Sequence, residues 1–237
     1  MHVGTGFAGN VQAAIEARAF VKVIMMGPPG AGKGTQSAML ARQLGVPSIS
    51  TGDMLREEVR RKTTLGGAAK RHMDKGELVP DAVIIGVIEE RLRQPDCAPG
   101  FILDGFPRTV AQAEALGSVL DVLKYRIDQV VSIAVPNEEL IKRLSGRRTC
   151  RDCGALYHII FDPPTNAGIC NKCNGDLYQR DDDHEDIIVS RLEIYARETT
   201  ALLEYYRARG LLAEVDGIGG REDILARVLE CLGVRAA

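Results

Sequence analysis

Short apolar runs alternate with longer segments of helical periodicity along most of the chain. Each apolar run is brief and bounded by turn-forming residues, which indicates a buried strand. Between the runs, apolar side chains recur three and four residues apart, which indicates amphipathic helices. The predicted strands are 21–26, 46–50, 101–104, 129–135 and 211–215, and the predicted helices are 36–44, 51–59, 62–76, 78–92, 138–145, 183–209 and 224–232.

Strands that alternate with helices along a chain pack as a parallel sheet with helices on both faces. We therefore expect a doubly wound α/β domain with about five parallel strands. Two local features refine this pattern. Gly66 and Gly67 are expected to break the helix around them, and Asn137 is expected to cap the helix that follows it.

The composition is that of an ordinary globular protein. The chain has 237 residues, of which 45% are hydrophobic and 26% charged, and its formal net charge is −2. This balance argues against a general nucleic-acid or membrane-surface binder, and no apolar run is long enough to cross a bilayer. Residues 21–237 are expected to form one domain with a small insert. We expect it in the cytoplasm, and the fold suggests a monomer.

Residues 1–20 differ from the rest of the chain, with small residues, glycine and only a weak helical pattern at 10–18. They lack the basic region followed by an apolar core that marks a secretory signal. They are also poor in the arginine and serine of a transit peptide, which is the less favoured alternative. We expect a flexible or loosely docked extension, or a start codon assigned too early.

A glycine-rich loop, Gly27–Thr35, joins the first predicted strand to the next helix. Glycines let backbone N–H groups approach an oxyanion, the helix N-terminus favours negative charge, and Lys33 adds a charge that can follow phosphates. The pattern indicates a nucleoside triphosphate site of the phosphate-loop type. It departs from the general motif at Gly34, because the hydroxyl expected there on magnesium comes one residue later. A bare turn is the alternative, but it gives the lysine little structural use.

A second polar landmark is Asp104, which ends the apolar run Phe101–Leu103. In open parallel sheets, ligands bind at the carboxyl ends of the strands. This carboxylate is therefore expected to hold magnesium or the waters bound to it. The alternative is an ordinary turn-forming aspartate before Gly105.

Four of the six cysteines lie in two Cys-x-x-Cys pairs, and sixteen residues separate the pairs. This spacing is typical of a structural zinc site, in which two knuckles supply four thiolates and leave no open position. The intervening segment is too short to build a core, so the metal would stabilise it. Disulfides or free thiols are the alternatives, and His158 is expected to be a bystander. The predicted ligands are Cys150, Cys153, Cys170 and Cys173.

Several arginines stand near predicted turns and helix ends, where any one of them taken alone could be an ordinary solvated charge. Together with a triphosphate loop, they predict a site that neutralises several phosphates, as phosphoryl transfer requires. A phosphate acceptor is already anionic and needs no general base, which agrees with the lack of a Ser/His/Asp or Cys/His constellation. The arginines are Arg56, Arg108, Arg143, Arg147, Arg180 and Arg191.

The chain resembles the adenylate kinase family, in its long form with a zinc-binding lid, at four motifs in the family's order. The motifs are Gly27–Thr35, Ser50–Arg56, Asp104–Thr109 and Arg180–Asp183. The likeness extends from Val21 to the last predicted helix, and glycine at position 34 is also what this family shows. The departures are residues 1–20 and Gly219-Gly220, where a more polar adenine-site loop is expected.

The resemblance implies reversible, magnesium-dependent transfer of the terminal phosphoryl group of ATP to AMP, giving two ADP, in the service of adenine nucleotide homeostasis. It implies ATP-binding residues Gly30, Ala31, Gly32, Lys33, Gly34, Thr35, Arg143 and Arg147. It implies AMP-binding residues Thr51, Arg56, Val79, Gly105, Arg108, Gln112, Arg180 and Arg191. Its catalytic residues would be Lys33, Arg108, Arg180, Arg191 and Asp104, the last through magnesium.

The resemblance also divides the chain into parts. An AMP-binding segment would span about 50–79 and a zinc-binding lid about 146–183, and Asp182 and Asp183 would help the lid to close. The zinc ion would stiffen the lid as a rigid body without taking part in the chemistry.

Other functions stay open at this stage. The enzyme could be another nucleoside monophosphate kinase or could use GTP as donor, although Thr51 and the Arg108-Thr109 junction favour AMP as the acceptor. A different class is a zinc-ribbon binding module on a nucleotide switch that acts on nucleic acid. Against it, the sequence has no basic stripe with interleaved aromatics, and residues 181–186 are acidic.

Overall fold

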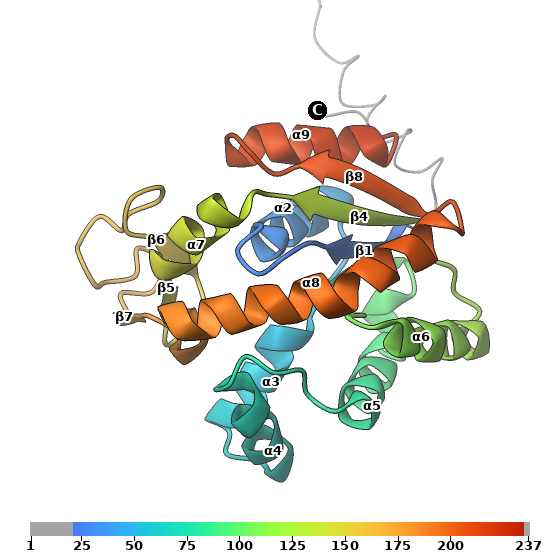
Figure 1. Cartoon of the computed structure of the whole chain (residues 1–237), viewed down its shortest axis with the longest axis horizontal. Coiled ribbons are helices and arrows are strands. Elements are labelled where there is room, and N and C mark those ends of the chain that lie inside the picture. The colour runs from blue at the N-terminus through green and yellow to red at the C-terminus, as the bar shows by residue number, and fades with distance from the viewer. Residues whose placement is uncertain (1–20, 235–237) are drawn as a thin grey trace, which may run out of the picture.

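In the computed structural model, which describes residues 21–234, five parallel strands form one sheet with helices on both faces (Figure 1). The strand order is β2–β3–β1–β4–β8, so the chain crosses over between neighbouring strands. The prediction of a doubly wound parallel sheet is confirmed, while the extension predicted at 1–20 lies outside the described residues. The strands are β1 Val21–Met26, β2 Ser48–Ser50, β3 Gly100–Asp104, β4 Gln129–Ala134 and β8 Leu212–Asp216.

The predicted helices are present, with ends that shift by a few residues. Within residues 21–234, no helix combines the length and the apolar character needed to cross a bilayer. The helices are α2 Lys33–Leu44, α3 Thr51–Arg60, α4 Thr64–Met73, α5 Asp81–Leu92, α6 Val110–Leu123, α7 Asn137–Ser145, α8 Glu185–Arg207 and α9 Arg221–Cys231, with short 3-10 turns η1 Pro95–Cys97 and η2 Asp181–Asp183.

Helix α6 was not predicted from the sequence. Its signal is nonetheless present, because Thr109 caps the helix by accepting a hydrogen bond from the Gln112 N–H. Ala113, Leu116 and Leu120 then follow at helical spacing, and all of them are buried. Helix α6 forms the connection from β3 to β4.

The sheet separates two apolar cores, and the alternation along β1 shows how. Ile24 and Met26 point into the core beneath α5, α6 and part of α8, whereas Val23 and Met25 point into the core beneath α2 and α9. Successive strand residues face opposite sides, so a strand covered on both sides must be apolar throughout. This burial explains why the strands appear in the sequence as continuous apolar runs.

A small antiparallel sheet projects from the main domain between α7 and α8 (Figure 1). Its strand order is β6–β5–β7, and its buried apolar cluster consists of Cys150, Tyr157 and Cys170. So few buried side chains provide little stability, as expected for an insert that depends on a metal. The strands are β5 Arg147–Cys150, β6 Leu156–His158 and β7 Leu177–Tyr178.

The predicted helix break at Gly66 and Gly67 is wrong, because α4 runs through both residues without interruption. Gly66 is needed for the packing of α4 against α3. A Cβ atom on Gly66 would lie 2.1 Å from the carbonyl oxygen of Glu58 at the end of α3. Gly66 thus permits a close approach of α3 and α4, whereas a Cβ on Gly67 would meet no atom within 4 Å.

The cap predicted at Asn137 is also wrong. Pro136 occupies the N-cap position of α7, and Asn137 is the first helical residue, with no side-chain hydrogen bond capping the helix. The fixed φ of Pro136, −60°, leads the chain into the helix without a side-chain cap.

The two adjacent glycines of α4 provide a matched test of this packing. Gly66→Ala is expected to lower the free energy of unfolding by about 1–3 kcal/mol, because the methyl group forces α3 and α4 apart. Gly67→Ala, at an open helical position, is expected to raise it by about 0.5–1 kcal/mol. Urea unfolding of both variants measures the difference, and equal effects would contradict the close approach.

Candidate active site

One cleft of about 840 Å³ collects every residue that the sequence predicted to bind ATP or AMP. Its walls come from the glycine loop, the ends of β3, α3 and α7, the small sheet and the loop before α9. The predicted residues that line it are Gly30, Ala31, Gly32, Lys33, Gly34, Thr35, Thr51, Arg56, Val79, Asp104, Gly105, Arg108, Gln112, Arg143, Arg147, Arg180 and Arg191.

The glycine loop curls around its own lysine. Gly30 and Gly32 adopt φ values of +85° and +92°, a region that side chains disfavour, and so let the loop close up before α2 begins. Lys33 Nζ donates hydrogen bonds to the carbonyl oxygens of Gly27 at 2.7 Å and Pro28 at 2.9 Å. The ammonium group is thereby held at the N-terminus of α2, where an anion is favoured.

The departure at Gly34 from the general loop motif has a steric explanation. A Cβ atom on Gly34 would lie 3.2 Å from Asp104 Oδ2. Since β1 and β3 are neighbours, with Met25 beside Asp104, the aspartate at the end of β3 reaches the start of α2. A serine or threonine at position 34 would crowd the carboxylate, and glycine leaves room for it.

Lys33 and Asp104 face each other deep in the cleft, and both have shifted pKa values. Loss of water lowers the pKa of Lys33 to about 8, an effect that Asp104 opposes and the nearby arginines reinforce. Burial raises the pKa of Asp104, and the charge of Lys33 opposes that rise. A buried carboxylate at this position could hold magnesium or its bound waters, as the donor chemistry of that ion requires.

The opposite end of the cleft is a cross-linked set of polar side chains. Gln112 accepts a hydrogen bond from the Arg108 N–H at 2.8 Å and donates one to Asp81 Oδ1 at 2.6 Å. Arg108 Nε and the Thr51 hydroxyl donate to the same carbonyl oxygen, that of Gly105, at 2.8 and 3.2 Å. These bonds fix the side chains in place before a ligand arrives.

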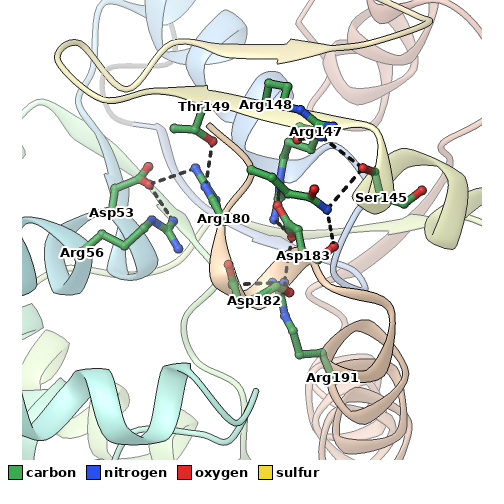
Figure 2. Close-up of polar contacts among 11 residues, drawn as sticks. Asp53, Arg56, Ser145, Arg147, Arg148, Thr149, Arg180, Asp182, Asp183 and Arg191 are labelled. Carbon is green, nitrogen blue, oxygen red and sulfur yellow. Dashed lines mark hydrogen bonds and ion pairs between the residues drawn. The ribbon is translucent and has the colours of Figure 1, made fainter. Parts of the chain in front are cut away.

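Between the two ends lies a cluster of arginines and aspartates (Figure 2). Asp183, fully buried, accepts hydrogen bonds from Arg147 Nε at 2.7 Å and from Arg147 Nη2. Arg191 lies 3.1 Å from a carboxylate oxygen of Asp182 and 3.2 Å from one of Asp183. The aspartates therefore hold these two arginines by their charge.

Arg180 joins the cluster from the other side. It donates to the Thr149 hydroxyl at 2.9 Å and lies 3.8 Å from Asp53, which also pairs with Arg56 at 2.6 Å (Figure 2). Asp53 is exposed to the cleft; partial loss of water disfavours its charge, yet Arg56 and Arg180 bring the pKa of its carboxyl below the usual value. Asp53 thus connects an arginine of α3 with an arginine of the insert.

Positive charge exceeds negative charge in the middle of the cleft. Burial, followed by the charges of Arg56 and Arg147, lowers the pKa of Arg180 to about 9. Burial, followed by the charge of Arg191, lowers the pKa of Arg108 to about 10. Crowded, partly desolvated cations are the electrostatic setting in which a polyanion binds strongly and developing phosphoryl charge is stabilised.

The insert also contacts the main domain directly. Asp162 of the insert pairs with Arg221 at the start of α9, at 2.6 Å, and Arg60 of α3 donates to the carbonyl oxygen of Arg151 at 3.2 Å. Arg143 does not contact the insert cluster; it pairs with Glu139 and donates to the Gly217 carbonyl oxygen at 3.1 Å. The cleft is accordingly covered by the insert.

The four predicted metal ligands come together. The Sγ atoms of the four cysteines all lie within 4.8 Å of one another. Cys150 and Cys173 are 3.4 Å apart and Cys153 and Cys170 are 3.5 Å apart, too far for disulfides, and the structure has these cysteines free. Four converging thiols with no competing ligand fit a structural zinc ion. His158 is not among them and bonds neighbouring backbone atoms instead.

Two residues of the cleft were absent from the predicted site. Asp53 and Asp162 line it, together with the loop between β8 and α9 whose Gly219 and Gly220 were noted in the sequence. Asp53 stands within the quoted motif Ser50–Arg56, so a partner for the arginines could have been sought there. The contact of Asp162 with Arg221 joins residues 59 positions apart in the chain, and no local pattern indicates it.

Comparison with known proteins agrees with this geometry. Residues 25–211 match the family model described as adenylate kinase. The adenylate kinase of Geotalea daltonii is 54% identical over 212 residues, which cover 90% of this chain and 99% of that protein. The adenylate kinase of Archaeoglobus fulgidus is 56% identical over 197 residues, 83% of this chain and 91% of that protein. This chain belongs to the adenylate kinase family.

Membership of the adenylate kinase family confirms the resemblance drawn from the four motifs. It also confirms that the chain is a nucleoside monophosphate kinase. The likeness extends over nearly the whole described chain, since the adenylate kinase of Syntrophobacter fumaroxidans, 54% identical over 213 residues, is covered for 100% of its length. The comparison gives no support to a zinc-ribbon switch that binds nucleic acid.

The pKa of Lys33 predicts a pH dependence of ATP binding. The protonated lysine attracts phosphate, and it loses its proton in the free protein as the pH rises through about 8. The dissociation constant for ATP is therefore expected to increase roughly tenfold between pH 7 and pH 9. Titration calorimetry at several pH values measures the slope.

The matched control is Lys33→Arg, which keeps the positive charge but does not titrate in this range. Its affinity for ATP is expected to be lower overall and to change much less between pH 7 and pH 9. A slope as steep as that of the original protein would contradict the assignment to Lys33.

Proposed function

We propose that the cleft transfers the terminal phosphoryl group of magnesium-bound ATP to AMP, reversibly, and releases two ADP. The observation that supports this proposal is that one cleft collects two sets of groups suited to bind phosphate. One end is the glycine loop with Lys33, and the other is formed by Arg56 and Arg108. An enzyme that joins two nucleotides needs both ends at once.

The arginines between the two ends supply the stabilisation. Arg180 and Arg191, with Arg147 beside them, converge where a phosphoryl group would pass from donor to acceptor. Such transfer depends on alignment and on neutralising charge over the equatorial oxygens, and little covalent chemistry is left to the protein. AMP brings an anionic oxygen as nucleophile, so no side chain has to remove a proton.

Asp104 would hold the magnesium ion of the nucleotide, directly or through water. When bound, magnesium neutralises the phosphate oxygens and favours the leaving of ADP. Gly34 leaves the space beside Asp104 open, and Thr35 brings a hydroxyl to the first turn of α2. The residues of this chain would position the phosphates. Lys33 would bind the γ-phosphate after breaking its hydrogen bonds to the carbonyl oxygens of Gly27 and Pro28.

Two segments would act as covers over the nucleotides. The AMP-binding segment is proposed at about 50–79 and the lid at about 146–183, with Asp182 and Asp183 binding the arginines that cross between lid and core. Arg60 of the first segment donates to the Arg151 carbonyl oxygen of the second, a contact that would hold the two covers together when both are closed. Closure would exclude water, which otherwise accepts the phosphoryl group.

Nucleoside diphosphate formation from magnesium-ATP and each of AMP, UMP, CMP and GMP tests the function. AMP is expected to be the preferred acceptor. Arg108→Ala is expected to lower kcat/KM about 10²- to 10³-fold, because it removes a cation from the acceptor phosphate.

Arg126→Ala is the control, since Arg126 is exposed and lies outside the cleft. Its rate is expected to match that of the original protein. Replacement of ATP by GTP in the same assay measures donor preference. Binding of ATP without phosphorylation of any monophosphate would refute the proposal.

The four-cysteine cluster predicts one bound zinc ion per chain. Cys170→Ser is expected to lose the metal and to expose residues 147–178 to limited proteolysis, because few side chains stabilise the small sheet. Cys231→Ser, outside the cluster, is expected to keep the metal and the resistance to proteolysis. Elemental analysis measures the metal, and full zinc content in Cys170→Ser would contradict the site.

A further inference from the structure

We propose that Arg227 is a positioning residue for the donor nucleotide, because its guanidinium holds the loop against which the donor base lies. The loop, Gly217–Gly220, joins β8 to α9 and lines the cleft at Ile218, Gly219 and Gly220. This inference rests on the proposed function, in which a triphosphate occupies the glycine loop.

The proposed place of the donor base follows from where the phosphates would bind. The triphosphate is proposed on the loop before α2 and the acceptor at α3 and α6, so the rest of the cleft lining is left for the donor base. There the cleft is bounded by Ile218–Gly220, by Arg143 and by Phe161 of the insert, whose ring stacks on His158 at 4.4 Å. This end of the cleft has the apolar surface that a nucleobase requires.

The loop has few side chains of its own that could restrict its backbone. Three of its four residues, Gly217, Gly219 and Gly220, are glycines. Glycine has the largest conformational freedom of any residue, so such a loop samples many arrangements unless other groups hold it. A wall that moves reduces affinity, because the ligand must then order it on binding.

Arg227 removes this freedom from one side. Its Nη1 donates to the carbonyl oxygen of Asp216 at 2.8 Å and to that of Ile218 at 2.7 Å, so one guanidinium nitrogen bridges both ends of a turn of the loop. The side chain comes from α9, a helix packed on α2 and β8, and so ties the loop to the rigid domain. A planar guanidinium with fixed donors suits this bridging.

Two further bonds hold the ends of the same loop. Arg143 donates to the Gly217 carbonyl oxygen at 3.1 Å, and Gln36 of α2 donates through Nε2 to the Arg221 carbonyl oxygen at 3.0 Å. The hydrogen bond of Gln36 thus connects α2, the helix that follows the glycine loop, to the end of the loop proposed to contact the base. Arg227 differs from Arg143 in that it does not line the cleft, so it acts on the ligand only through the loop.

Steady-state kinetics and direct binding test the inference. Arg227→Met keeps the aliphatic length and removes both donors. It is expected to raise KM and the dissociation constant for ATP about five- to tenfold and to leave kcat and KM for AMP unchanged. The inhibition constant of inorganic tripolyphosphate, which has no base, is also expected to stay unchanged. Arg227→Lys, which retains a donor, is expected to recover part of the affinity for ATP.

The control is Arg209→Met. Arg209 also donates to a backbone carbonyl, that of Tyr205 at 3.0 Å, but it is exposed to solvent and lies outside the cleft. All of its constants are expected to match those of the original protein. Thermal unfolding of every variant shows whether α9 remains folded, and Arg227→Gln replaces Arg227→Met if the latter unfolds.

The inference is overturned if KM and the dissociation constant for ATP change less than twofold in Arg227→Met. It is also overturned if the constants for ATP, AMP and tripolyphosphate all weaken together, because that pattern indicates a general loss of structure. If the original protein forms no ADP, the proposed function fails on its own. The binding constants for ATP and tripolyphosphate then still decide whether the clamp acts on the base.

Discussion

The structure depends on the close packing of charged side chains, arginines beside arginines and beside aspartates, in a cleft that removes much of their water. Arg147 and Arg191 approach each other only because buried Asp183 lies between them, and Arg56 and Arg180 are similarly joined by Asp53. Desolvated cations repel one another, so such a cluster is stable only with fixed counter-charges or a bound polyanion. The aspartates hold the arrangement, and the remaining positive charge is available to phosphates.

The rest of the fold serves to bring these charges to one place. The ends of β1 and β3 deliver the glycine loop and Asp104 to the same edge of the sheet, as parallel strands do at their carboxyl ends. The small sheet brings Arg147 and Arg180 over that edge. Because its core is so small, its shape depends on its cysteines, and the position of the arginines depends on the shape. Stability of the insert and electrostatics of the cleft are therefore linked.

Three glycines have different surroundings here, and only contacts distinguish them. Gly34 makes room for the Asp104 carboxylate, Gly66 lets two helices meet, and Gly67 has open space around it. The adjacent pair in α4 was predicted to break a helix, because propensity alone treats both residues alike. Packing overrides propensity when a neighbouring backbone occupies the space of a Cβ atom.

By itself the sequence determined most of the strand and helix pattern, the glycine-rich loop, the four clustered cysteines and the candidate arginines, because periodicity and spacing are local properties. It did not determine which aspartate pairs with which arginine, why Gly34 replaces a hydroxyl, or that Arg227 reaches back to the loop before its own helix. Those contacts join residues distant in the chain. Only the tertiary structure decides them, since distance and burial set whether two charges attract strongly or are screened by water.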